Sequence, residues 1–118
     1  MPRTSSSTVK VFYPKYNRED IIEMLQEALP RLQEKLSLKS VALFGSYATG
    51  NFTVASDIDL LVVYNGIERD DAYALCKKTF GIPHLEPHVY SEREYEEMKP
   101  TINRMIKGGV VLFRQRKA

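Results

Sequence analysis

The amino-acid sequence predicts an α/β sandwich in one compact domain. Strand-like and helix-like segments alternate along the chain, as they do in folds that cover a sheet with helices. A chain of 118 residues buries roughly two-thirds of its surface on folding, which is enough for one core. Hydrophobic residues make up 43% and charged residues 27%, close to the globular average, so intrinsic disorder is excluded. These observations leave the order of the strands open.

The first expected elements are a leader, an edge strand and a long helix. Residues 1–8 are rich in Ser and Thr and predict a flexible leader, and residues 9–13 favour a short edge strand halted by Pro14. Asn17 then caps a helix whose apolar residues recur at helical spacing through Leu36. Pro30 falls inside this stripe, so we expect it to kink the helix or split it.

Two short apolar segments predict the central strands of the sheet. Residues 41–44 end at Gly45 and Ser46, and residues 58–64 are closed by the turn signal Asn65-Gly66. A helix is expected over residues 69–80.

The remaining elements are an extended segment, a helix and a last strand. Residues 84–90 are expected to be extended, because Pro83 and Pro87 disfavour helix around them. Ser91 with Glu94 forms a capping-box pattern, which predicts a helix to about Lys107. Residues 110–113 are the last strand. The predicted domain covers residues 9–113, and residues 114–118 form a basic tail.

Composition excludes several classes of protein. No apolar run approaches the ~20 residues of a membrane span, and a single cysteine, Cys76, cannot form an internal disulfide. These features predict a cytoplasmic protein without a membrane partner. The net charge of +2 does not favour nucleic acid as a partner, although the last 20 residues hold six basic and no acidic residues. That basic segment is either a solvated terminus or a contact for phosphate or a partner.

Asp57 and Asp59 are the first candidate site residues. They lie two apart at the start of an apolar strand, so both carboxylates project from the same face. Two like charges held this close repel each other unless a cation lies between them, and Mg²⁺ or Mn²⁺ suits such oxygen ligands. The alternative is that the two residues only cap loop amides.

Gly45 and Ser46 are the second candidate pair. A glycine lets backbone amides approach a phosphate closely, and the serine supplies a hydroxyl donor. If the two central strands are neighbours, this pair faces the same crevice as the two aspartates. An ordinary strand-to-loop turn is the alternative, and no Walker-type lysine follows.

Glycine, serine, ten residues and Asp-x-Asp together resemble the signature of the DNA polymerase beta nucleotidyltransferase superfamily. The small size resembles its minimal nucleotidyltransferase (MNT) branch. The resemblance implies a mixed β-sheet flanked by helices. It also implies that Gly45 and Ser46 bind the phosphates of ATP or another NTP, and that Asp57 and Asp59 hold two Mg²⁺ or Mn²⁺ ions with a third carboxylate from a later strand.

Glu86 is the candidate for that third carboxylate, because it is the acidic residue of the extended segment 84–90. The alternative is that Glu86 is a solvated strand residue. His88 shares its face by the strand period of two and is an accessory candidate, either donating to a phosphate or orienting Glu86. A structural histidine is the alternative. His84 and His88 have the spacing of a zinc-binding helix, but Pro83 and Pro87 oppose that helix.

The resemblance implies a metal-dependent enzyme that transfers an NMP to a hydroxyl acceptor. AMP from ATP is the first candidate for the transferred group. A chain of 118 residues leaves little room for an acceptor domain, which implies a complex with a partner or a homo-oligomer. The resemblance implies that this partner is a helical HEPN-type protein of a toxin–antitoxin pair. The alternative is a non-catalytic nucleotide-binding or antitoxin-like module with the same fold. Tyr47 and Thr49 favour this alternative, because minimal family members often carry arginines in the loop after Gly45 and Ser46. The candidates for a cation in their place are Lys39, Lys77 and Lys78.

Overall fold

The structure of the chain is a computed structural model that describes residues 16–53 and 55–116. The strands are β1 (Leu38–Phe44), β2 (Ile58–Tyr64), β3 (Leu85–Ser91) and β4 (Val110–Arg114). The helices are α1 (Arg18–Gln33), α2 (Ser46–Thr49), α3 (Ala72–Phe80), α4 (Glu92–Glu97) and α5 (Lys99–Met105). The expected leader (residues 1–8) and edge strand (residues 9–13) lie outside the described residues.

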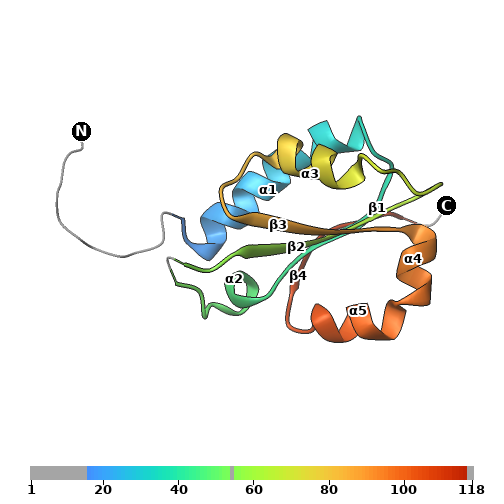
Figure 1. Cartoon of the computed structure of the whole chain (residues 1–118). Helices are drawn as coiled ribbons and strands as arrows, with labels where there is room; N and C mark the ends of the chain where they lie inside the picture. The colour runs from blue at the N-terminus through green and yellow to red at the C-terminus, as the bar shows by residue number, and fades with distance from the viewer. Residues whose placement is uncertain (1–15, 54, 117–118) are drawn as a thin grey trace.

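The four strands form one mixed sheet in the order β3-β2-β1-β4. β1 runs antiparallel to both β2 and β4, while β2 and β3 are parallel. Helices α1 and α3 lie on one face of the sheet, and α4 and α5 lie on the other (Figure 1). This arrangement confirms the predicted α/β sandwich, and it makes the two predicted central strands neighbours.

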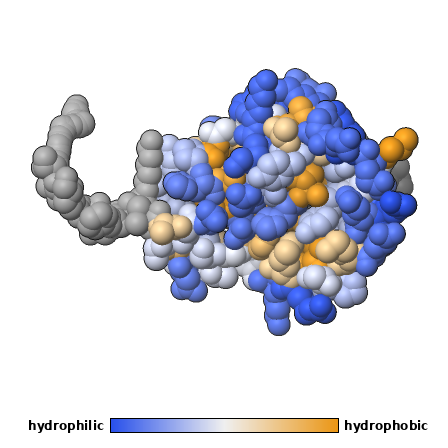
Figure 2. All heavy atoms as spheres, in the orientation of Figure 1, coloured by the Kyte–Doolittle hydropathy of each residue, from blue (hydrophilic) through white to orange (hydrophobic). Residues whose placement is uncertain are grey.

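The core is divided between the two faces of the sheet, because successive side chains of a strand point to opposite faces. Leu60 and Val62 belong to the larger cluster with α1 and α3, while Leu61 and Val63 pack with Ile102 of α5. Polar side chains cover most of the surface seen in Figure 2, with smaller apolar areas among them. Within the described ranges, no helix combines the length and the apolar character needed to cross a membrane.

Helix α1 begins as predicted and ends earlier. The Asn17 side chain accepts from the Asp20 amide, and the Asp20 side chain accepts from the Asn17 amide, which completes a capping box. The expected split at Pro30 does not occur. Pro30 lies in the last turn of one continuous helix, which ends at Gln33, so the loss of one amide bond does not split the helix.

The helix expected from Ser91 to Lys107 is two helices, which corrects the prediction. α4 ends at Glu97, and α5 begins at Lys99 with Pro100 in its first turn. Proline disfavours helical backbone in the residue before it, and it is best tolerated in the first turn of a new helix. The break at Met98 therefore follows from Pro100, and it lets α5 place Ile102 in the core.

Two other boundaries differ from the prediction. β1 begins at Leu38, three residues before the expected start. α3 begins at Ala72, after a turn in which Arg69 and Asp71 form an ion pair at 2.8 Å. That guanidinium lowers the pKa of the Asp71 carboxyl below its ordinary value.

Ser91 is expected to stabilise the C-terminal half of the domain. The buried Ser91 hydroxyl accepts from the Glu94 amide at 3.1 Å and donates to Glu68 at 2.9 Å. Ser91→Ala removes both bonds and should lower the free energy of unfolding by about 1–2 kcal/mol in urea denaturation. The same substitution at exposed Ser37 should change it by less than about 0.5 kcal/mol. Equal effects at the two positions would contradict the capping role.

Candidate active site

The sheet register brings the two candidate pairs together. β1 and β2 are antiparallel, and Phe44 at the end of β1 pairs with Asp59 at the start of β2. Gly45 and Ser46, which follow Phe44, therefore lie beside the two aspartates. The crevice expected from the sequence depended on the two strands being neighbours, and the register meets this condition.

Gly45 is fixed by close contact with Asp59 and by its backbone angles. A Cβ at this position would lie 2.5 Å from Asp59 Oδ2, so a side chain has no room. The backbone has φ +78° and ψ −156°, a region that almost only glycine occupies. Ser46 follows as the first residue of α2, where the first amides of a helix have no intrahelical acceptor. The glycine thus lets the backbone of this segment approach the Asp59 carboxylate closely.

Asp59 is held from a second direction by His88 of β3. His88 Nε2 lies 3.2 Å from Asp59 Oδ1, and the imidazole ring packs 5.0 Å from the Phe44 ring. The two side chains are 35% and 30% exposed, so the pair is accessible but not fully solvated. The partner of His88 is Asp59 rather than Glu86, and the ring fixes the orientation of this carboxylate.

Asp57 is exposed and directly precedes β2. The neighbouring Ile58 amide bonds the His84 carbonyl at 2.8 Å, which ties the start of β2 to the segment that leads into β3. His84 has a positive φ of 66° at this point. The connection fixes the segment that carries Asp57 at the start of β2.

Glu86 lies beside Asp59 along the sheet but turns toward α3. Their Cα atoms are partners in the parallel register of β2 and β3. Tyr73 Oη donates to Glu86 Oε1 at 3.0 Å, and this bond to the carboxylate raises the pKa of the Tyr73 phenol. Across residues 16–53 and 55–116, no group of three or more His, Cys, Asp or Glu side chains is assembled into a metal site. The register of β2 and β3 thus places Glu86 where a third carboxylate is expected, but the Glu86 side chain bonds Tyr73 instead.

The loop after Gly45 uses its side chains to hold itself together. Tyr47 is buried and stacks on Phe52 at 4.2 Å between ring centroids, and Thr49 Oγ1 donates to the Gly45 carbonyl at 3.3 Å. Burial raises the pKa of the Tyr47 phenol, which stays neutral. These two positions give the loop rigidity rather than positive charge.

Arg18 supplies a cation near this loop that the sequence did not indicate. Its Nε donates to the Ala48 carbonyl of α2 at 3.0 Å. Twenty-eight positions of chain separate Arg18 from Ser46, so no local motif signalled the contact; only the fold of α1 against α2 creates it. Tyr73 was missed for the same reason, since it reaches Glu86 from another element.

The lysines considered as substitute cations are engaged elsewhere. Lys39 lies near the opposite end of β1 and pairs with Glu92 at 3.2 Å. Lys77 Nζ donates to the Leu85 carbonyl at 2.8 Å, next to Glu86. Lys78 is an exposed residue of α3.

Comparison with known proteins agrees with this geometry. Residues 25–112 match the family model of the nucleotidyltransferase domain. A "putative protein adenylyltransferase" of Methanocaldococcus jannaschii is 47% identical over 45 residues, which are 38% of this chain and 46% of that protein. Another of the same description is 39% identical over 62 residues, covering 52% of this chain and 60% of that protein. The matched segments thus span about half the length of these relatives.

Solved structures share the fold at low sequence identity. The crystal structure of a "putative nucleotidyltransferase" from Sulfolobus solfataricus superposes with a TM-score of 0.58 at 22% identity, covering 86% of both chains. A toxin–antitoxin structure with AMP-PNP superposes with a TM-score of 0.56 at 19% identity, covering 77% of this chain and 74% of that one. Because the family model covers well over half of the sequence, the chain belongs to the nucleotidyltransferase domain family.

Proposed function

We propose that the chain is a metal-dependent nucleotidyltransferase that transfers AMP from ATP to a hydroxyl group of a partner protein. The observation that carries this proposal is the close approach of Gly45 to Asp59, which has room for no side chain. Phosphate donors and carboxylates then share one end of the sheet. The adenylyltransferase descriptions of the relatives support AMP as the transferred group.

The residues present fit a divalent metal. Mg²⁺ is usually held by one or two carboxylates together with substrate phosphates, rather than by a cage of protein ligands alone. Asp57 and Asp59 provide such a pair, and Glu86 is the third ligand if its side chain turns from Tyr73 toward Asp59. We propose two Mg²⁺ or Mn²⁺ ions, which when bound would lower the pKa of the attacking hydroxyl and neutralise charge on the phosphates.

The remaining residues position the substrate. Ser46 and the first amides of α2 bind the phosphates, and His88 holds Asp59 in one orientation. Arg18 adds positive charge beside α2 without entering the loop. These roles consist of placement and charge stabilisation, which supply most of the rate in phosphoryl-type transfers.

The acceptor is proposed to be a hydroxyl group on a helical HEPN-type protein. The toxin–antitoxin structure with the same fold supports a protein partner, and a homo-oligomer is the other candidate.

A non-catalytic nucleotide-binding module is the second candidate function. It is favoured by Tyr47 and Thr49, whose side chains stabilise the loop and offer no charge to a phosphate. Such a module would bind ATP through Gly45 and Ser46 and transfer nothing.

Labelled ATP distinguishes the two functions. The chain is incubated with Mg²⁺, the helical protein encoded beside it, and ATP labelled at either the α- or the γ-phosphate. We expect acid-stable α-label on the partner and no γ-label, because AMP is transferred and pyrophosphate leaves. ATP binding with no transfer of α-label would favour the binding module instead.

Tyr73→Phe is expected to strengthen metal binding at this site. The substitution removes the hydrogen bond that holds Glu86 toward α3, and so frees the carboxylate to turn toward Asp59. The Mg²⁺ concentration for half-maximal transfer should fall by up to about fivefold, the worth of one hydrogen bond. Tyr90→Phe in the neighbouring part of β3 is the control. A rise in the Mg²⁺ requirement would instead mean that Tyr73 supports Glu86 in its working position.

A further inference from the structure

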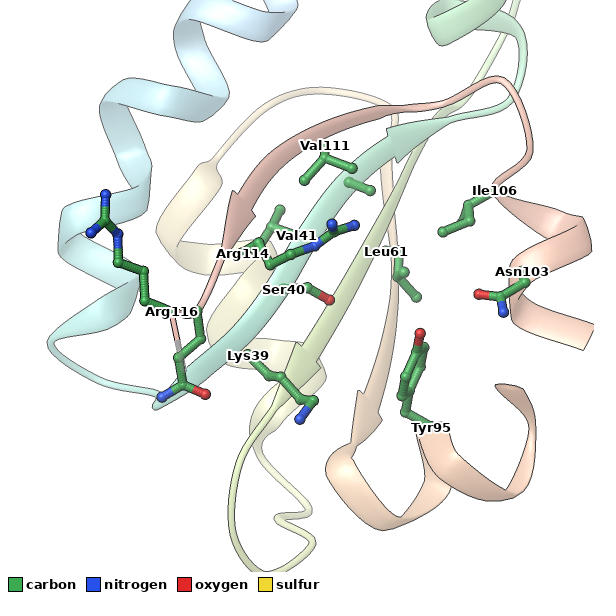
Figure 3. A pocket seen from close by; sticks show the side chains of 12 residues that line it. Lys39, Ser40, Val41, Leu61, Tyr95, Asn103, Ile106, Val111, Arg114 and Arg116 are labelled. Atoms are coloured by element: carbon green, nitrogen blue, oxygen red, sulfur yellow. The ribbon is translucent and has the colours of Figure 1, made fainter. Parts of the chain in front are cut away.

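A hollow of about 550 Å³ opens on the sheet face that α4 and α5 cover (Figure 3). Its floor includes Ser40, Ala42 and Leu61, while the candidate active site begins at Phe44 and Asp59, two residues farther along the same two strands. None of Gly45, Ser46, Asp57, Asp59 and Glu86 lines it. The hollow is thus separate from the site to which the proposed function is assigned, and its volume lies in the range of small-molecule sites.

The charge of the hollow favours an anion. The Arg114 guanidinium extends over the floor in Figure 3, and within the described part of the chain it forms no ion pair. Lys39 stands at the rim, where it pairs with Glu92. None of the lining residues is acidic. The parallel N–H donors of a guanidinium without a carboxylate partner match the oxygen atoms of a phosphate group.

Two irregularities of the sheet shape this hollow. β1 carries an extra residue, Lys39, between its pairs with Tyr64 and Val63 of β2. β4 carries an extra residue between its pairs with Val41 and Ala42 of β1. β-Bulges bend a strand and re-aim its side chains, and they are frequent beside functional sites. Both strand distortions fall at the hollow.

The walls combine apolar surface with amide groups. Leu61, Ile106 and Val111 present aliphatic side chains, and Val111 is 50% exposed although it is apolar. Tyr95 and Asn103 point into the same space from α4 and α5 (Figure 3). Asn103 offers both a donor and an acceptor, the combination that the edge of a nucleobase requires.

From these features we infer that the hollow is a second ligand site, which binds a nucleoside monophosphate without a metal ion. Arg114 pairs with the phosphate, the aliphatic side chains pack on the ring, and Asn103 bonds the edge of the base. The inference is independent of the proposed function, because it uses neither the carboxylates nor the Gly45–Ser46 segment.

Calorimetry of the full chain with AMP in excess EDTA tests this site. We expect one AMP to bind, and Arg114→Gln to weaken it by about tenfold or more, the loss of a charge-assisted pair. Arg104→Gln makes the same charge change at an exposed residue of α5 that does not line the hollow, so AMP affinity should change less than about twofold. Asp70→Asn, at an exposed position outside both sites, should leave AMP binding in EDTA unchanged.

Two further ligands and one variant test the recognition of the base. Adenosine and inorganic phosphate should each bind about tenfold or more weakly than AMP, because each lacks one half of the contacts. Asn103→Ala should weaken AMP and leave inorganic phosphate unaffected. The inference is overturned by no AMP binding in EDTA, by equal affinities for AMP and inorganic phosphate, or by equal effects of the two arginine variants.

Discussion

Asp59→Asn is expected to lower the rate of AMP transfer by about a thousandfold or more, since under the proposed function it removes a negative charge and one of the proposed metal ligands. Asp59 contacts several parts of the candidate site. Its carboxylate lies against Gly45 and 3.2 Å from His88, and its backbone pairs along the sheet with Phe44 and Glu86. Asparagine keeps the shape and can still accept from His88, so the fold should be retained. Transfer of α-label from ATP measures the loss.

Asp70→Asn is the matched control for this prediction. It makes the same chemical change at an exposed position outside the candidate site, and it should leave transfer unchanged. Circular dichroism and urea denaturation should give the same transition for both variants as for the parent chain. Activity retained in Asp59→Asn would remove this residue from the reaction.

Gly45→Ala is expected to reduce transfer by at least a hundredfold and to destabilise the protein by about 1–3 kcal/mol. The added Cβ would meet Asp59 Oδ2 at 2.5 Å, and the backbone lies in a region that alanine rarely adopts. The carboxylate must then move away from the phosphate-binding segment. Steady-state transfer and urea denaturation measure the two effects separately.

Gly50→Ala distinguishes backbone strain from the contact with Asp59. Gly50 also has a positive φ, +88°, but a Cβ there would meet nothing within 4 Å. It should cost about 1–2 kcal/mol of stability and leave most of the transfer activity. If both glycine variants lost activity to the same degree, loop strain alone would explain the result, and the close approach would have no role.

The sequence predicted the elements whose causes are local. The capping pattern at Ser91 and the apolar segments at residues 41–44 and 58–64 depend on neighbouring residues, and the structure confirms them. The single helix predicted after Ser91 is wrong, because Pro100 favours the start of a second helix at Lys99. The split expected at Pro30 is wrong, because the loss of one amide bond leaves the helix continuous to Gln33.

The site was predictable only where a motif marks it. Gly45, Ser46, Asp57 and Asp59 lie within one short segment, and the register of β1 and β2 was sufficient to join them. Arg18 and Tyr73 reach the site from helices that are distant along the chain, so periodicity could not reveal them. The predicted roles of Glu86 and His88 as metal ligand and accessory residue stay predictions, with Asp59 as the structural partner of His88.

The most direct measurement of the central claim is paramagnetic broadening of backbone amide signals by Mn²⁺ with a non-hydrolysable ATP analogue. If Asp57 and Asp59 hold the metal beside Gly45, broadening should be strongest at Gly45, Ser46 and Asp59 and weak around Leu38 at the opposite end of β1. Asp59→Asn should abolish this pattern. Broadening centred on Arg114 and Tyr95, or no localised broadening at all, would contradict the assignment of this end of the sheet as the catalytic site.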